Sequence, residues 1–90
     1  MLTPTFAGPF KKDRKLMKKR NRDMDKLTEI MTMLINEQPL QPKHENHPLH
    51  GTYKGKWECH IEPDWILIYR IDKKNRRIIY YRTGSHSDFF

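Results

Sequence analysis

The chain has 90 residues, a length that allows one domain with one hydrophobic core. Lys and Arg number 18 against 11 Asp and Glu, which gives a formal net charge of +7. This excess favours a polyanionic partner, although it can also simply keep a small protein soluble. Cys59 is the single cysteine, which excludes an internal disulfide and fits a reducing cytosol. We expect one domain over residues 1–90, with neither export signal nor membrane span.

The N-terminal part predicts a short strand followed by a basic helix. Residues 1–8 can form a strand, which Pro4 confines to a sheet edge because proline lacks a backbone donor. Residues 9–20 have helical composition, with Pro9 suited to the first turn. This helix has two interpretations, an ordinary solvated face or a surface that follows phosphates. Its apolar stripe is Phe10, Leu16 and Met17, and its basic residues are Lys11, Lys12, Arg14, Lys15, Lys18, Lys19 and Arg20.

Residues 24–35 show the clearest periodicity in the chain and predict an amphipathic helix. Asp23 is suited to its N-cap, and the helix should end before Pro39. Residues 37–52 show neither helical nor strand period, so we expect a long structured loop there. The apolar positions of the helix are Met24, Leu27, Ile30, Met31, Leu34 and Ile35.

Three strand-like runs follow the loop, at residues 57–62, 65–71 and 76–82. The gaps between them are short, which predicts an antiparallel meander. The middle run is apolar on both faces, as expected for a central strand covered by helices. An α+β fold is therefore expected, with two N-terminal helices packed on a twisted antiparallel sheet.

The 5 histidines are the side chains best suited to move protons near neutral pH. The spacing of His44, His47 and His50 is similar to that of a metal-binding tract. It lacks cysteine and any carboxylate held by a helix, so we expect no metal site there.

Two further segments could carry chemistry. Pro63 interrupts the strand after His60 and could fold Asp64 back toward that histidine, although Asp64 could equally just cap the turn. The last strand ends in a glycine turn before His86, with Phe90 four residues further on. A histidine, the nearby Arg82 and a terminal aromatic together suit RNA cleavage, although each signal alone is weak.

These residues closely resemble the YafQ toxins of the RelE/ParE superfamily, and the resemblance covers most of the chain from the first helix onward. The resemblance implies a RelE-like β-α-α-β-β-β domain with the active site on the open side of the sheet. Pro4 and Gly8 make the first strand less regular than that fold prefers. The matching segments are Asp23 through Leu27, Leu34-Ile35-Asn36, His47-Pro48-Leu49, Gly51, Lys54-Gly55, His60 through Tyr69, and Arg82-Thr83-Gly84-Ser85-His86.

The resemblance implies an endoribonuclease without a cofactor, which attacks the phosphate with the adjacent ribose 2′-OH. We expect His86 to be the general acid, and His60 supported by Asp64, or Asp64 itself, to be the general base. His47 would position the phosphate from the loop. Arg82, together with Lys54 or Lys56, would neutralise the phosphate, while Phe90 would stack on a base next to the cut.

The implied function is ribosome-dependent cleavage of mRNA by the toxin of a type II toxin–antitoxin system. Its partners would be the ribosome, mRNA and a DinJ-like antitoxin, through which alone it would contact operator DNA. Two alternatives stay open. One is a ParE-like gyrase poison on the same fold, and the other is a non-catalytic nucleic-acid-binding module in which only Lys and Arg matter.

Overall fold

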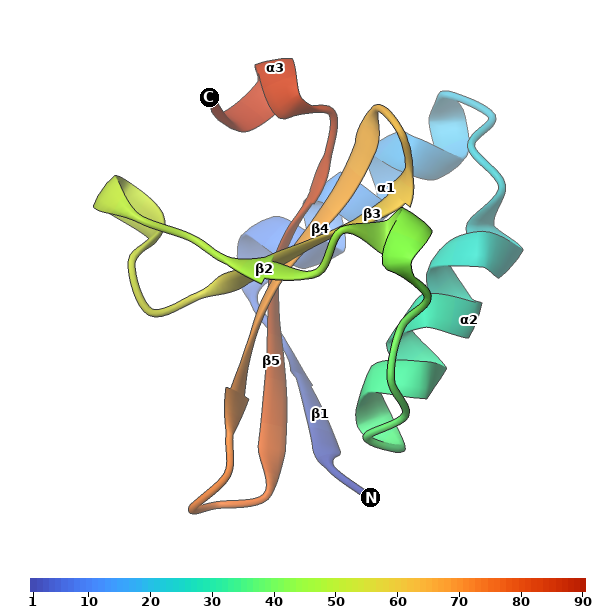
Figure 1. The fold of residues 1–90 in the computed structure, drawn as a ribbon. Coiled ribbons are helices and arrows are strands. Elements are labelled where there is room, and N and C mark those ends of the chain that lie inside the picture. The colour runs from blue at the N-terminus through green and yellow to red at the C-terminus, as the bar shows by residue number, and fades with distance from the viewer.

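The computed structural model describes all residues from Met1 to Phe90, as an α+β fold with helices packed on a five-stranded sheet (Figure 1). The strand order is β1-β5-β4-β3-β2. The elements are β1 (Thr3–Phe6), α1 (Gly8–Lys19), α2 (Met24–Ile35), the 3-10 turn η1 (Pro42–His44), β2 (His47–Pro48), the 3-10 turn η2 (Gly51–Tyr53), β3 (Trp57–Glu62), β4 (Trp65–Asp72), β5 (Arg77–Gly84) and α3 (His86–Phe89).

The sheet is mixed, which corrects the expectation of a purely antiparallel sheet. Strands β3, β4 and β5 form the predicted antiparallel meander. Strand β1 lies at the edge, as Pro4 required, but it pairs parallel to β5. A parallel pair needs a long crossover, which the two helices and the meander supply. Strand β2 was not predicted, because two residues that include a proline show no alternation.

The two long helices begin where local signals place them. In α1, Pro9 occupies the first turn. The side chain of Asp23 caps α2 by accepting a hydrogen bond from the amide of Asp25. The apolar stripe expected for α1 is wrong at Leu16, whose side chain is 40% exposed. The charged residue Asp13 completes the buried stripe instead, between Phe10 and Met17.

The sheet has one covered face and one open face. The main core of 14 buried residues joins the two long helices to the covered face, which includes Cys59, Leu67 and Tyr69. A small cluster of Leu49, Ile66 and Ile68 lies apart from that core. Figure 1 shows α3 beyond the end of β5, far from the N-terminus. None of the helices has the length and apolar character needed to cross a membrane.

Candidate active site

Strand β3 places a carboxylate and a histidine side by side on the open face. Glu58 lies opposite Ile68 of β4, and His60 lies opposite Ile66, so both share the face of the small apolar cluster. Cys59, between them, points into the main core. Glu58 is only 2% exposed and His60 only 9% exposed. This face therefore buries polar side chains, which requires that they be paired.

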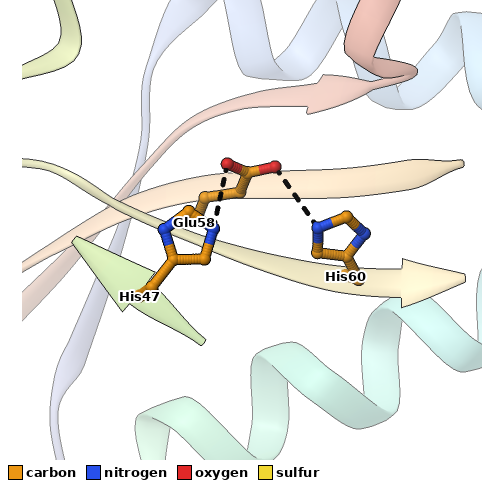
Figure 2. Close-up of side chains that lie close together, drawn as sticks. All are labelled: His47, Glu58 and His60. Carbon is orange, nitrogen blue, oxygen red and sulfur yellow. Dashed lines mark ion pairs between the residues drawn. The ribbon is translucent and has the colours of Figure 1, made fainter. Parts of the chain in front are cut away.

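The carboxylate of Glu58 is the centre of the cluster. Figure 2 shows it between the imidazole rings of His47, from β2, and His60. Oε2 lies 3.4 Å from Nε2 of His47, and Oε1 lies 3.6 Å from Nε2 of His60. His86, from α3, adds a hydrogen bond of 2.6 Å between its Nε2 and Oε1 of Glu58. Three imidazoles from separate elements thus converge on one buried carboxylate.

Backbone carbonyls determine which imidazole nitrogens carry hydrogens. Nδ1 of His60 lies 3.1 Å from the carbonyl oxygen of Pro63, and Nδ1 of His47 lies 3.1 Å from that of Pro48. A carbonyl oxygen only accepts, so each Nδ1 must donate. In the neutral rings the lone pair is then on Nε2, the atom that faces Glu58. The neutral His60 ring therefore presents its acceptor nitrogen toward the Glu58 carboxylate.

His86 has the opposite arrangement. Its Nε2 donates to Glu58, and its ring is about half exposed, with a side-chain exposure of 51%. No hydrogen bond engages its Nδ1. The ring contacts His60 edge to face at a centroid distance of 5.5 Å, and Phe90 at 5.2 Å. A protonated His86 can therefore offer Nδ1–H to a ligand while Glu58 fixes the ring.

The ring of Phe90 lies beside those of Tyr53 and His86. The Phe90 ring is 5.5 Å from that of Tyr53 in η2, and the residue remains 62% exposed. It lines an open cavity of about 280 Å³ beside His86, together with Leu49 and Glu58. An exposed aromatic ring at the edge of such a cavity is available to stack on a nucleobase.

Asp64 does not fold back onto His60, which corrects the geometry expected for this pair. It is exposed in the turn between β3 and β4. The carboxylates within ion-pair distance of His60 are those of Glu45, at 3.9 Å, and Glu58. The carbonyl of Asp64 accepts a hydrogen bond from Arg22, and its carboxylate forms no ion pair. The turn after Pro63 instead brings the Pro63 carbonyl to His60.

The cationic residues expected to bind phosphate differ in how many contacts they already make within the protein. Arg82 donates from Nε and Nη2 to Asp13, at 2.7 and 3.1 Å, so only Nη1 is unengaged. This contact raises the pKa of Arg82 and keeps it charged. Lys56 lies over the ring of Tyr81, with Nζ 4.6 Å from its centroid. Lys54 is exposed.

Glu58 is the functional candidate that the sequence interpretation missed. It stands two residues before His60, and alternation along a strand puts such residues on one face. That spacing was the available signal. The neighbouring thiol can be set aside, because burial, and secondarily Glu58, raises the pKa of Cys59 to about 12. Such a thiol is not a nucleophile near neutral pH.

The histidines of the 44–50 tract do not come together as a metal site, and only His47 of the three belongs to a group with suitable geometry. Nδ1 of His44 lies 2.6 Å from the carbonyl oxygen of His60, where it donates a hydrogen bond. His50 is exposed and takes no part in the cluster. The group with suitable geometry is His47, Glu58 and His60, whose ligand atoms all lie within 4.8 Å of one another. Two imidazoles and one carboxylate form a donor set that fits Zn²⁺ or Cu²⁺.

Comparisons with known proteins agree with this fold along its whole length. Residues 2–90 match the family described as the bacterial toxin of a type II toxin–antitoxin system, YafQ. The Escherichia coli K12 protein named mRNA interferase toxin YafQ is 46% identical over 86 residues, covering 94% of this chain and 91% of the relative.

Solved structures match equally well. The E. coli DinJ–YafQ complex contains a chain that is 42% identical, with a TM-score of 0.90 and coverage of 100% of this chain and 99% of the other. A metal-bound toxin from Helicobacter pylori is 41% identical, with a TM-score of 0.93 and complete coverage of both chains, 100% and 100%. By sequence and by fold, this chain belongs to the YafQ family of type II toxin–antitoxin toxins.

Proposed function

We propose that residues 1–90 form a single toxin domain that acts as an mRNA interferase, cleaving RNA by attack of a ribose 2′-OH on the adjacent phosphate. The observation that carries this proposal is the convergence of three imidazoles on Glu58, on the open face of the sheet. Two histidines close to one phosphate can take one proton and give another, as this reaction requires. The name of the E. coli relative, an mRNA interferase, supports the same activity.

His86 is the proposed general acid. Its Nδ1 is unengaged, while Nε2 is held by Glu58 at 2.6 Å. In the reaction the 5′-oxygen of the leaving nucleotide would take the Nδ1 proton as its bond to phosphorus breaks. Glu58 would stabilise the imidazolium before transfer and fix the ring throughout.

His60 is the first candidate for the general base and Asp64 is the second. The Nε2 lone pair of neutral His60 would accept the 2′-OH proton as the 2′-oxygen attacks phosphorus. His60 has the better support from geometry, because its ring is oriented by the Pro63 carbonyl and faces a carboxylate. Asp64 has an exposed carboxylate that a substrate could reach directly. His47, on the other side of Glu58, would position the phosphate.

Charge and stacking complete the proposed site. Nη1 of Arg82, and Lys54 or Lys56, would neutralise the charge that builds on the phosphate oxygens. Phe90, which is 62% exposed, would stack on a base beside the cut. Each acid or base group of this kind contributes about 10²–10⁴-fold to the rate.

We also propose that cleavage depends on the ribosome and so takes place in the cytoplasm. The cavity beside His86 is shallow, at about 280 Å³, which is too small to grip an unstructured strand by itself. The exposed face of α1 carries cations without an ion-pair partner, and ribosomal RNA phosphates are suitable ligands for them. These residues are Lys11, Lys12, Lys15, Lys18 and Lys19.

The decisive experiment compares translating ribosomes with the same mRNA free in solution, followed by mapping of the new RNA ends. We expect cuts at defined codon positions only on ribosomes, and no cuts with His86→Gln. Cleavage that persists in His86→Gln would remove that residue as the acid. No cleavage by the wild-type protein in either tube would favour the gyrase-poison or binding-module alternatives, and a DNA supercoiling assay would separate those two.

A DinJ-like antitoxin is the proposed protein partner, because a DinJ–YafQ complex has been solved for a relative of the same fold. This antitoxin, not the toxin, would contact operator DNA. Co-expression with the antitoxin should abolish RNA cleavage. A toxin–antitoxin complex that still cleaves RNA at the full rate would contradict the proposal that the antitoxin inhibits the toxin.

Metal binding at His47, Glu58 and His60 is a second candidate function, favoured by the donor geometry and by the metal-bound H. pylori relative. A bound Zn²⁺ or Cu²⁺ ion would supply Lewis acidity, but it would also occupy the nitrogen lone pair proposed to accept the 2′-OH proton. We expect it to inhibit. Calorimetric titration with Zn²⁺ tests binding, with His47→Gln as the variant that should weaken it. Equal affinity in both proteins would exclude this site.

A further inference from the structure

The helix α3, which carries His86, is too short to hold its own position. It spans His86–Phe89, and its ends are closed by backbone hydrogen bonds from Asp88 to Ser85 and from Phe90 to His86. A single helical turn is unstable in isolation, because the cost of fixing its dihedral angles exceeds the gain from its few hydrogen bonds. The direction in which His86 points must therefore be set by contacts with the rest of the molecule.

One such contact joins the end of α1 to α3. Arg20 donates from Nη1 to Oδ2 of Asp88 at 3.2 Å, and the same oxygen accepts from the amide of Ser85 at 2.8 Å. The hydrogen bond from the Ser85 amide, and secondarily the one from Arg20, lowers the pKa of Asp88 and keeps its carboxylate charged. A Cβ atom added at Gly84 would lie 2.7 Å from this oxygen, so the carboxylate is packed directly on the end of β5.

A second contact starts from Asp13, the charged residue on the buried stripe of α1. Its carboxylate accepts from Arg82 at 2.7 and 3.1 Å and from the amide of Thr83 at 3.2 Å. The guanidinium of Arg82 in turn lies over the ring of Phe89 in α3, 4.7 Å from its centroid. Asp13 therefore fixes the end of β5 and, through Arg82, the other side of α3.

We propose that Asp13 and Arg20 are positioning residues for the RNA cleavage, which hold α3 so that His86 meets Glu58. This inference rests on the proposed function of the same site. Asp13 lies in α1 and Arg20 is the C-cap residue of that helix, and neither contacts the histidine cluster itself. They act through Asp88, Arg82 and Phe89, whereas Glu58 and Phe90 contact His86 directly. A displacement of about 1 Å in a proton donor costs roughly 100-fold in rate, so a small loss of placement should be measurable.

The substitutions Arg20→Gln and Asp13→Asn remove each anchor while keeping side chains of similar size. Arg20 has an exposed side chain, at 43%, and an ion pair of this kind contributes little to stability, so Arg20→Gln should fold normally. Arg20→Lys keeps the charge and serves as the conservative rescue. Arg76→Gln is the matched control, because Arg76 forms an exposed ion pair with Glu37 at 2.8 Å in a distant turn.

Cleavage rates measured on ribosomes over a range of mRNA concentrations give kcat and KM separately. We expect kcat to fall roughly 10-fold in Arg20→Gln and roughly 100-fold in Asp13→Asn, with KM nearly unchanged. Arg20→Lys should recover most of the loss, and Arg76→Gln should cleave like the wild type. In NMR spectra the ring protons of His86 should shift in both anchor variants, because they leave the edge-to-face contacts with His60 and Phe90, now at 5.5 and 5.2 Å.

Three results would overturn the inference. One is a wild-type kcat together with unchanged His86 NMR signals in Arg20→Gln. This variant tests the inference even if Asp13→Asn does not fold. Another is a raised KM at constant kcat, which would assign Arg20 to RNA binding. The third is an equal loss in Arg76→Gln, which would indicate general destabilisation. If the wild-type protein cleaves no RNA, the proposed function fails, while the His86 signals still test the positioning.

Discussion

Strand β3 presents two surfaces that differ at every second residue. On the covered face, Cys59 and Ile61 are packed among the residues of the main core, at 0% and 6% exposure. On the open face, Glu58 and His60 are almost equally buried, yet they are polar and paired with other polar groups. The same backbone therefore supports an apolar core on one face and a cluster of histidines around a carboxylate on the other.

The two faces of β3 differ in what they contribute, one to stability and the other to the proposed chemistry. Apolar burial stabilises the fold in proportion to the area removed from water. A buried carboxylate has the opposite tendency, because desolvation opposes its charge and the surrounding imidazoles must offset that cost. We therefore expect substitutions on the covered face to lower stability and leave the chemistry intact. Substitutions on the open face should lower the cleavage rate with little change in stability.

The largest effect is expected for Leu67→Ala on the covered face. Leu67 is 0% exposed, so its removal leaves a cavity and should lower the free energy of unfolding by about 3 kcal/mol. Urea denaturation measures this change. Leu16→Ala, at a side chain that is 40% exposed, is the matched control and should cost far less. Equal losses at both positions would contradict the assignment of the core.

Glu58→Gln should have the next largest effect, but on the rate. The amide keeps the shape and can still accept from His86, so the unfolding free energy should change by less than about 1 kcal/mol. Loss of the charge should lower kcat roughly 100-fold, because the imidazolium is no longer stabilised. Glu37→Gln, at a carboxylate paired with Arg76, is the control. A Glu58→Gln protein with wild-type kcat would show that the cluster is not catalytic.

Alkaline pH should weaken the covered face. Burial raises the pKa of Cys59 from 9.0 to about 12, and it also raises the pKa values of Tyr69 and Tyr80. Above pH 9 the unfolded chain releases protons that the folded protein retains. The free energy of unfolding should therefore fall as pH rises toward 12, by about 1.4 kcal/mol per pH unit for the thiol. Denaturation at several pH values measures the slope, which Cys59→Ala should reduce. A flat profile would contradict the burial of these groups.

The smallest effect is expected for Lys56→Gln at the rim of the open face. Lys56 is half-buried over Tyr81 and would contact phosphate without taking part in proton transfer. We expect KM to rise about 2- to 5-fold, kcat to stay constant, and the slope of log KM against log salt concentration to decrease by about one. Cleavage assays at several salt concentrations give both quantities. A changed kcat would place Lys56 among the reacting groups.

Most of the fold could be predicted, because the helices and the meander carry local periodicity. The apolar positions of α2 and the strand runs of β3 to β5 follow from patterns within each segment. The parallel pairing of β1 with β5 could not be predicted, because it joins residues 3–6 to 77–80 and no local pattern records such a partner. Strand β2 was not predicted for a different reason, because two residues that include a proline show no alternation.

The candidate site was predictable in part. His47, His60 and His86 were identified by residue type and family resemblance, and the structure brings all three to one carboxylate. The carboxylate was expected to be Asp64, its neighbour across a turn, but it is Glu58. Which carboxylate lies beside His60 depends on the direction of the turn after Pro63, and the sequence alone does not determine that direction. Asp13 was likewise hidden, because its partner Arg82 lies 69 residues away.

The pairing of β1 with β5 has a consequence for biosynthesis. The first strand can find its neighbour only after residues 77–80 have been made, and Asp13 can find Arg82 only after that. Contacts of such wide sequence separation form late, because the intervening chain must first be brought together. A nascent chain therefore carries its basic helix long before it carries a formed cluster of histidines. The cluster of three histidines on Glu58 cannot form before His86 has been synthesised.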